Sequence, residues 1–179
     1  MAVAKAGMDE TPCGPNPAEE GWFVLDLADA LAARNEVKGG AIYPLEPRGE
    51  PFTHFGVNVH VLWPGEPNGL YHSENVREAF LVLSGECTLV VEEEERTLRQ
   101  WDFVHCPAGT HHIFVGAGGG PCAILMIGGR GEGHALHYPV SEVAAKHDAS
   151  AAEDTPNPDE AYADWPGEYD LVRLPWPVE

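Results

Sequence analysis

The sequence predicts an all-β fold, either a closed barrel or a sandwich of two sheets. Between residues 52 and 129 it contains several short runs that are apolar or that alternate between apolar and polar residues, with Gly and Pro between them. Short strands at nearly even spacing with such turns are typical of these two architectures. The chain has 179 residues, of which 44% are hydrophobic, enough for one domain with a substantial core.

The region before the predicted barrel has a different composition. Residues 1–20 are rich in Pro, Gly and Glu and are expected to form a flexible arm. Residues 21–35 favour a short strand and then a helix through Leu27 and Leu31. Residues 39–52 repeat Gly and Pro, which indicates a connection with short edge strands.

The barrel strands are predicted between residues 52 and 129. The first, residues 52–63, alternates like a half-buried strand. The last, residues 121–129, is almost continuously apolar, which is typical of a buried strand. Residues 96–107 hold either two short strands or one bent strand. Further strand-like runs are residues 78–85, 86–93 and 110–120.

After the barrel the pattern becomes polar and helical. Ser141 is predicted to cap a helix within residues 139–150. A second helix is expected within residues 155–166, with Pro166 ending it. The sequence therefore predicts a barrel domain at residues 21–135, with its core at 52–128. The predicted extension at residues 136–179 is helical or irregular and packs on that barrel.

The charge of the chain excludes several classes of partner. Asp and Glu number 29 against 10 Lys and Arg, a net charge of −19, so nucleic acid and anionic membranes would be repelled. No apolar run is long enough to span a membrane, and the first residues lack the apolar segment of a secretory signal. The four cysteines form no CxxC pair and are expected to be free thiols. We therefore expect a cytoplasmic protein.

The stretch HSENVREAFLVLSG, residues 72–85, carries the first group of candidate metal ligands. His72, Glu74 and Glu78 have the same parity, so an extended segment would place all three on one face. Imidazole and carboxylate groups together suit Fe(II), Mn(II), Zn(II) or Ni(II). The alternative interpretation is that these residues are exposed charges that lead into a strand.

The stretch DFVHCPAGTHHIFV, residues 102–115, supplies the second group. A turn at Pro107 and Gly109 precedes His111 and His112, and a strand follows. With both stretches in view, the sequence resembles the cupin superfamily. The positions that match its first motif, G-x5-H-x-H-x3,4-E-x6-G, are Gly65, His72, Glu74, Glu78 and Gly85. The positions that match its second motif, G-x5-P-x-G-x2-H-x3-N, are Trp101, Pro107, Gly109, His112 and Gly116.

The match departs from the family pattern at several positions. Six residues rather than five separate Gly65 from His72, and Glu74 stands where the second His is usual. Trp101 replaces a Gly, and Gly116 replaces the final Asn. These departures leave open the alternative of a degenerate barrel that binds no metal.

The resemblance implies a small double-stranded β-helix, a jelly-roll barrel like that of small bacterial cupins, which are often homodimers. It also implies a divalent metal ion (Fe, Mn, Zn or Ni) held by His72, Glu78 and His112. Glu74 is a candidate fourth ligand, or a general base that holds a water or a substrate group. His112 rather than His111 fits the motif spacing, and adjacent strand residues face opposite sides.

Four further residues are predicted to line the pocket beside the metal. Asn58 and His60 share parity on the first barrel strand, and the alternative is that they form its polar outer face. Phe80 and Phe114 are expected to form apolar walls next to the ligands. The main functional hypothesis is a metal-dependent enzyme acting on a small organic molecule, of oxygenase or isomerase type. The alternative is a non-catalytic module that binds a metal or small ligand for sensing or storage.

Overall fold

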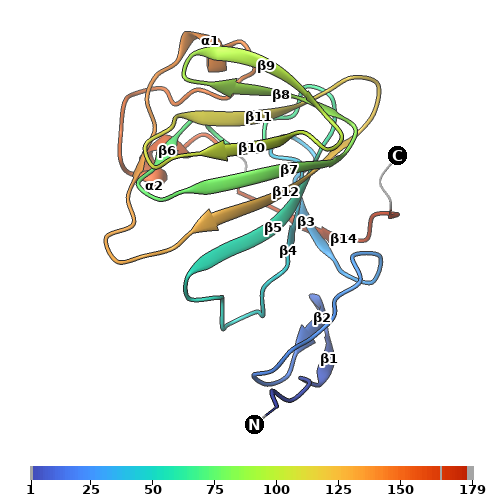
Figure 1. Cartoon of the computed structure of the whole chain (residues 1–179). Helices are drawn as coiled ribbons and strands as arrows, with labels where there is room; N and C mark the ends of the chain where they lie inside the picture. Colours follow the sequence, from blue (N-terminus) through green and yellow to red (C-terminus); the bar gives the residue numbers. More distant parts are fainter. Residues whose placement is uncertain (1, 166, 177–179) are drawn as a thin grey trace.

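Two antiparallel sheets form the body of the molecule (Figure 1). A computed structural model describes residues 2–165 and 167–176. The larger sheet has the strand order β10-β7-β12-β5-β4-β3-β14, and the smaller has the order β11-β8-β9. This is the predicted all-β fold, a double-stranded β-helix of the jelly-roll type with few short helices.

The strand boundaries agree closely with the runs predicted between residues 52 and 129. The larger sheet consists of β3 (Ala32–Arg34), β4 (Ala41–Pro44), β5 (Phe55–Leu62), β7 (Glu78–Ser84), β10 (Phe103–Cys106), β12 (Cys122–Gly129) and β14 (Asp170–Val172). The smaller sheet consists of β8 (Glu86–Val91), β9 (Glu94–Arg99) and β11 (His112–Ala117). Residues 96–107 therefore contribute to two strands, β9 and β10, rather than to one bent strand.

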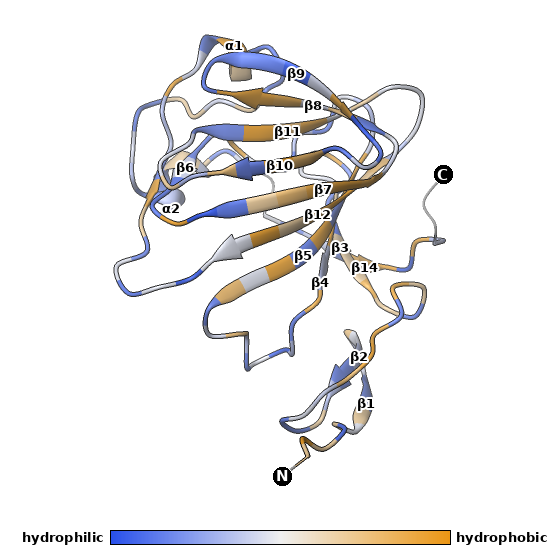
Figure 2. Ribbon diagram, viewed as in Figure 1, coloured by the Kyte–Doolittle hydropathy of each residue, from blue (hydrophilic) through white to orange (hydrophobic). Residues whose placement is uncertain are grey.

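The main core fills the space between the two sheets. Inward-facing residues of β7 alternate with less buried ones, and Phe80 and Val82 belong to this core. Leu89 and Phe114 enter it from the smaller sheet. Figure 2 shows β9 as largely hydrophilic beside the apolar β8, which matches the exposure of β9 along most of its length.

A second core covers the outer face of the larger sheet. Its buried residues include Tyr43, Val59 and Val61, and the segments that pack on them contain Leu27 and Trp176. The ring of Trp176 meets that of Tyr43 edge-on, with centroids 5.4 Å apart. Both the chain before β3 and the chain after β14 therefore pack on this side of the barrel.

The helix predicted through Leu27 and Leu31 is wrong. Residues 27–29 form a turn, and the chain enters β3 at Ala32. The side chain of Asp26 accepts a hydrogen bond from the N–H of Ala28 (2.9 Å), which stabilises the turn locally. Pairing of β3 with β4 and β14 then outweighs the weak preference of this stretch for a helix.

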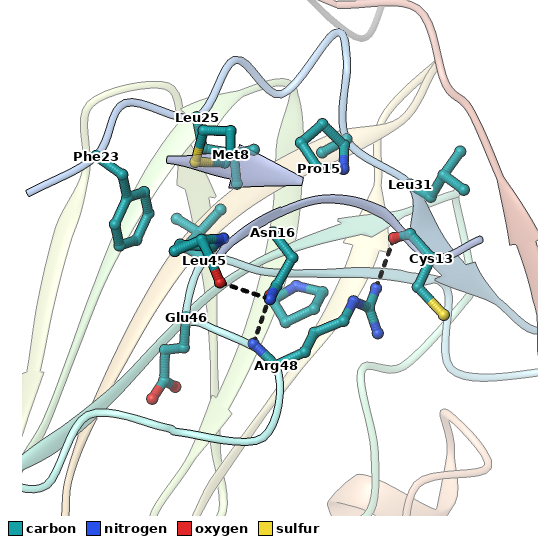
Figure 3. Close-up of a pocket in the computed structure, with 13 residues that line it drawn as sticks. Met8, Cys13, Pro15, Asn16, Phe23, Leu25, Leu31, Leu45, Glu46 and Arg48 are labelled. Atoms are coloured by element: carbon teal, nitrogen blue, oxygen red, sulfur yellow. Dashed lines mark hydrogen bonds between the residues drawn. The ribbon is translucent and has the colours of Figure 1, made fainter. Parts of the chain in front are cut away.

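The N-terminal residues form a hairpin, β1 (Met8–Thr11) with β2 (Gly14–Pro17), within the segment predicted to be a flexible arm. The N–H of Arg48 donates to Oδ1 of Asn16 (2.7 Å), and its guanidinium donates to the carbonyl of Cys13 (2.9 Å), so the hairpin is tied to the β4–β5 connection (Figure 3). The cavity drawn there has a volume of about 20 Å³. That is room for about one water molecule, too small for an organic ligand.

Two short helices follow the barrel. Ser141 caps α1 (Glu142–Ala145) as predicted, and its Oγ accepts a hydrogen bond from the N–H of Ala144 (3.0 Å). Asn157 caps α2 (Pro158–Ala161), and the predicted stop at Pro166 lies outside the described residues. Residues 177–179 of the predicted extension also lie outside them. Within the described part of the chain, none of the helices has the length and apolar character needed to cross a bilayer.

Candidate metal centre

His72 and His112 are placed side by side by the backbone. The N–H of His112 donates to the carbonyl of His72 (2.8 Å), and the N–H of His72 donates to the carbonyl of His112 (3.2 Å). His112 is the first residue of β11, and His72 directly precedes β6 (Ser73–Glu74), which pairs with β13 (Leu136–His137). This bridge joins two segments forty positions apart and leaves their imidazole rings 5.2 Å apart.

Glu78 completes a group of three potential ligands. It is the first residue of β7, and one donor atom from each of His72, Glu78 and His112 lies within 4.8 Å of the other two. Nε2 of His112 is 3.6 Å from Oε2 of Glu78. His112 is 3% exposed and Glu78 9% exposed, so the donors converge in a place largely closed to bulk water.

Both imidazoles are held in one orientation by backbone carbonyl groups. Nδ1 of His72 donates to the carbonyl of Leu70 (2.7 Å), and Nδ1 of His112 donates to the carbonyl of Thr110 (3.1 Å). A carbonyl oxygen only accepts hydrogen bonds, so both Nδ1 atoms carry the proton. In the neutral form of each ring, Nε2 therefore keeps a free lone pair, as metal-bound histidines require.

Aromatic rings fix the positions of the two histidines further. The ring of Phe80 lies 5.1 Å from that of His112, and the ring of Phe114 lies 6.1 Å from it. The ring of Tyr138 lies 5.5 Å from that of His72. These contacts restrict ring rotation and exclude water behind the donors, so the site needs little rearrangement to bind an ion.

The electrostatics of the group show crowding of negative charge. Burial and the neighbouring Glu74 carboxylate raise the pKa of Glu78 to about 7. Burial and the proximity of His72 lower the pKa of His112 to about 4, so this imidazole is neutral at physiological pH. Burial alone would lower the pKa of His72, but its contacts with Glu74, the Leu70 carbonyl and Glu78 raise it overall. A metal ion at Nε2 of His72 would replace a proton there, and His112 is already neutral.

Glu74 lies next to this group but has another partner. Its Oε2 accepts a hydrogen bond from Nε2 of His134 (2.8 Å), and its Oε1 is 3.7 Å from Nε2 of His72. Burial alone would raise the pKa of Glu74, but its bonds with His72 and His134 lower it overall. Glu74 is therefore ionised and is oriented by two imidazoles.

An open pocket of about 430 Å³ lies beside Glu78, whereas neither His72 nor His112 is among its lining residues. Glu74 and Glu78 line one part of it, and Asn58 lies on another. The remaining lining residues come mainly from the glycine-rich end of β12 and the loop after it: Gly56, Gly128, Gly129, Arg130, Gly131 and His134. Such a pocket is large enough for a small organic molecule.

Of the four residues predicted to line the pocket, Phe80, Phe114 and His60 do not line it and lie further inside the barrel. Asn58 lines the pocket, whereas Phe80 and Phe114 belong to the core behind His112. His60 is 8% exposed, and its Nδ1 has no hydrogen-bond partner in the described part of the chain. The alternative of a polar outer face for β5 is wrong, because Leu62, of the same parity, packs in the core between the sheets.

His111 points away from the three donors, as the alternation of strand residues predicts. Its Nε2 lies 3.2 Å from Nδ1 of His137, and its ring stacks on Tyr71. Sequence reasoning missed His134 and Arg130, because they follow the last predicted strand in a glycine-rich loop that matches no motif.

The residues present fit a divalent metal ion. Two imidazole nitrogens and one carboxylate oxygen form the two-histidine, one-carboxylate set, which leaves coordination positions open for other ligands. This donor set suits Fe(II), Mn(II), Zn(II) and Ni(II), and it does not distinguish among them.

Comparison with known proteins supports the fold and a cupin-type domain. A family model described as a cupin domain matches residues 58–128, and no curated protein matches the sequence significantly. A sugar phosphate isomerase of the cupin superfamily from Silicibacter pomeroyi is 28% identical, with a TM-score of 0.56, over 65% of this chain and 82% of its own. The polyketide cyclase RemF from Streptomyces resistomycificus is 18% identical, with a TM-score of 0.51, over 60% of this chain and 79% of its own.

Proposed function

We propose that the cupin-type domain that residues 58–128 form binds a divalent metal ion and catalyses a reaction of a small organic molecule. The observation that carries this proposal is the convergence of His72, Glu78 and His112, because Glu78 also lines an open pocket. Both Nδ1 atoms are engaged by carbonyl groups, so the Nε2 lone pairs are available to the ion. The ion would supply Lewis acidity or oxygen activation.

We infer that Glu74 and His134 handle protons beside the ion. A carboxylate hydrogen-bonded to an imidazole fixes the tautomer and orientation of that ring, and both groups face the pocket. Glu74 is then better assigned as a proton-handling group than as a fourth ligand, because Oε2 is already engaged by His134. His134 would accept or donate the proton at the pocket side.

An isomerase-like reaction is the type that we favour. The protein from Silicibacter pomeroyi is named a sugar phosphate isomerase, and isomerisation needs a proton carrier beside a polarised carbonyl group. The two-histidine, one-carboxylate set also suits an oxygenase, which is the second candidate.

One experiment separates these candidates. The purified protein, analysed for metal content and then loaded with the metal found, is incubated with aldoses and ketoses in D₂O. An isomerase would incorporate deuterium next to the carbonyl carbon, and NMR would detect it. Oxygen uptake with a catechol and no deuterium incorporation would favour an oxygenase. Bound metal with neither activity would leave a non-catalytic binding module.

We also propose that the protein acts in the cytoplasm as a homodimer without a nucleic-acid partner. Cys87, Cys106 and Cys122 are buried free thiols, which a reducing compartment would maintain. The edge strand β10 carries Phe103, 66% exposed, beside Trp101, 67% exposed. Apolar side chains of this size at a sheet edge are typical of an interface between subunits.

A further inference from the structure

We propose that the pocket beside the candidate metal centre selects a neutral, hydroxyl-bearing molecule and rejects its phosphorylated or carboxylated analogues. This inference rests on the proposed function, because it concerns the molecule that would lie next to the ion. Three features of the pocket carry it: its shape, the polar group at its base and the pairing of its charges.

Glycines make the space in which such a molecule would lie. The register of β5, β12 and β7 places Gly56, Gly128 and Glu78 next to one another across the sheet. A Cβ on Gly128 would lie 3.9 Å from Oε1 of Glu78. Any longer side chain at that position would fill the space beside the carboxylate, so Gly128 keeps the approach to Glu78 open. A Cβ on Gly56 would instead lie 3.0 Å from Nη2 of Arg130, so Gly56 makes room for that guanidinium group.

Asn58, the next residue of β5 on the same face as Gly56, places a carboxamide at the base of this space. Asn58 lines the pocket, and its Oδ1 is buried without a hydrogen-bond partner in the described part of the chain. His60, two residues further into the barrel, likewise has an unpartnered Nδ1. Buried polar atoms without partners are costly. A carboxamide both donates and accepts, and a hydroxyl group on a ligand matches both functions.

The charged groups around the pocket leave no cation for an anionic ligand. Arg130 is the one Arg or Lys among the lining residues, and Glu46 neutralises it. Nη2 of Arg130 donates to Oε1 of Glu46 (3.0 Å), and Nη1 donates to Oε2 of Glu46 (2.5 Å) and to the carbonyl of Phe52 (2.7 Å). His134 is engaged by Glu74.

The balance of charge therefore disfavours anions. A divalent ion would offset the two carboxylates of Glu74 and Glu78 and leave the pocket close to neutral. A phosphate group further from the ion would meet these carboxylates without a free guanidinium or ammonium group to pair with. The net charge of −19 on the chain would repel it as well. A phosphorylated substrate like that in the name of the Silicibacter pomeroyi protein is thus disfavoured here.

Matched pairs of probes test the inference. The metal-loaded protein is titrated with ribose and ribose 5-phosphate, fructose and fructose 6-phosphate, glycerol and glycerol 3-phosphate, and catechol and protocatechuate. Saturation-transfer NMR measures the dissociation constants. We expect at least one neutral member to bind, and to bind about tenfold more tightly than its anionic counterpart. Tighter binding of the anionic member of the pairs, or binding of no neutral member, would overturn the inference.

Two variants test the assigned residues. Asn58→Leu removes the carboxamide at similar volume, and we expect it to weaken the neutral ligand about tenfold. Glu46→Gln keeps an acceptor for the hydrogen bonds of Glu46 but frees the charge of Arg130, and we expect it to strengthen the phosphorylated probes about tenfold. The two outcomes are independent, so Glu46→Gln still tests the charge argument if Asn58→Leu does not fold. Unchanged discrimination in Glu46→Gln would contradict that argument.

Metal analysis of the same samples keeps the inference separate from the proposed function. Protein without bound metal would contradict the proposed function itself. Protein that retains its metal but prefers the phosphorylated probes would contradict only the selectivity inferred here.

Discussion

At the scale of single residues, the candidate site depends on which way adjacent side chains face. His111 and His112 are consecutive, yet only His112 turns toward Glu78, while His111 contacts His137 and Tyr71. The cause is the alternation of side chains along a strand. This pair therefore offers a matched comparison within the chain, because the two variants lose the same ring from opposite faces.

Replacement of His112 by Ala is expected to abolish metal retention while the barrel stays folded. The variant removes one of three donors, and we expect its metal content to fall to about a tenth of the wild-type value or less. Elemental analysis after gel filtration measures the metal, and far-UV circular dichroism checks the fold.

The control for this prediction is His111→Ala. Its ring lies outside the group of donors, so its metal content should equal that of the wild type. Equal metal content in both variants would refute the assignment of His112 as a ligand. Loss of metal from both would show that the β11 end rather than one donor was disturbed.

The buried His60 makes stability depend on pH. Burial lowers its pKa from 6.5 to about 4, because the folded barrel disfavours the charged imidazolium. In the unfolded chain the ring binds a proton below about pH 6.5, whereas the folded form does so only near pH 4. The contribution to stability is complete above pH 6.5 and declines as the pH falls toward 4, by about 3 kcal/mol in all.

Urea unfolding of the wild type and of His60→Leu measures this effect. When the pH is lowered from about 7.5 to about 4.5, the free energy of unfolding of the wild type should fall by about 2–3 kcal/mol more than that of the variant. The comparison removes the contributions of other titrating groups, since both proteins share them. Parallel pH profiles of the two proteins would show that His60 is not a buried neutral group.

At the scale of elements, the sequence predicts the strands that have a regular pattern of apolar residues. It does not predict the segments whose conformation depends on contacts with distant parts of the chain. The strands β7 and β12 are predicted correctly, because their residues are alternately or almost continuously apolar, as their burial is. The residues of β5 alternate in the sequence, but the second half of the strand is buried throughout, because segments pack on both of its faces. Residues 27–31 favour a helix on their own, but pairing of β3 with strands at both its edges decides their conformation. The hairpin of β1 and β2 depends on contacts with Arg48, more than thirty residues away.

The residues of the candidate site also form two groups, one that the sequence predicts and one that it does not. The donors His72, Glu78 and His112 are found from spacing and resemblance, because each lies at a fixed place relative to a turn and a strand. The wall that contains Arg130 and His134 is set by a loop that crosses the end of the barrel, and no local pattern specifies that path. The depth of His60 depends on the whole barrel rather than on its own strand.

Gly116 shows why one departure from the cupin motif is tolerated in this chain. A Cβ at this position would lie 2.1 Å from the carbonyl oxygen of Trp63, so β11 can approach the end of β5 only with a glycine there. The N–H of Gly116 donates to the carbonyl of Glu66 (2.9 Å), and its carbonyl accepts from the N–H of Gly65 (2.8 Å). The family's Asn at this position would clash with the backbone.

Replacement of Gly116 by Ala is therefore expected to destabilise the barrel. The added methyl group meets backbone atoms that have to shift, and we expect a loss of about 2–3 kcal/mol in the free energy of unfolding. Gly119→Ala is the control, because no atom lies within 4 Å of a Cβ there. Chemical denaturation of the two variants measures the difference, and equal stabilities would show that β11 does not approach β5 this closely.

At the scale of the whole molecule, the outer face of the larger sheet is covered unequally. Leu27 and Trp176 pack on the part built by β5 and β4. On the same sheet, Phe103 of β10 pairs in register with Leu81 of β7 and remains 66% exposed. An exposed apolar side chain on the edge strand of a sheet favours association with another chain, so we place the proposed dimer interface at β10.

Replacement of Phe103 by Asp is expected to convert the proposed dimer to a monomer. A carboxylate at the centre of the interface would lose its hydration without a cationic partner, which costs more than the lost apolar contact alone. Light scattering coupled to gel filtration measures the molar mass of wild type and variant at matched concentrations. Val140→Asp, at an exposed apolar residue beside α1, is the control and should keep the wild-type mass. A dimer that persists in Phe103→Asp would place the interface elsewhere, and a monomeric wild type would show that the exposed edge serves no association of this chain with itself.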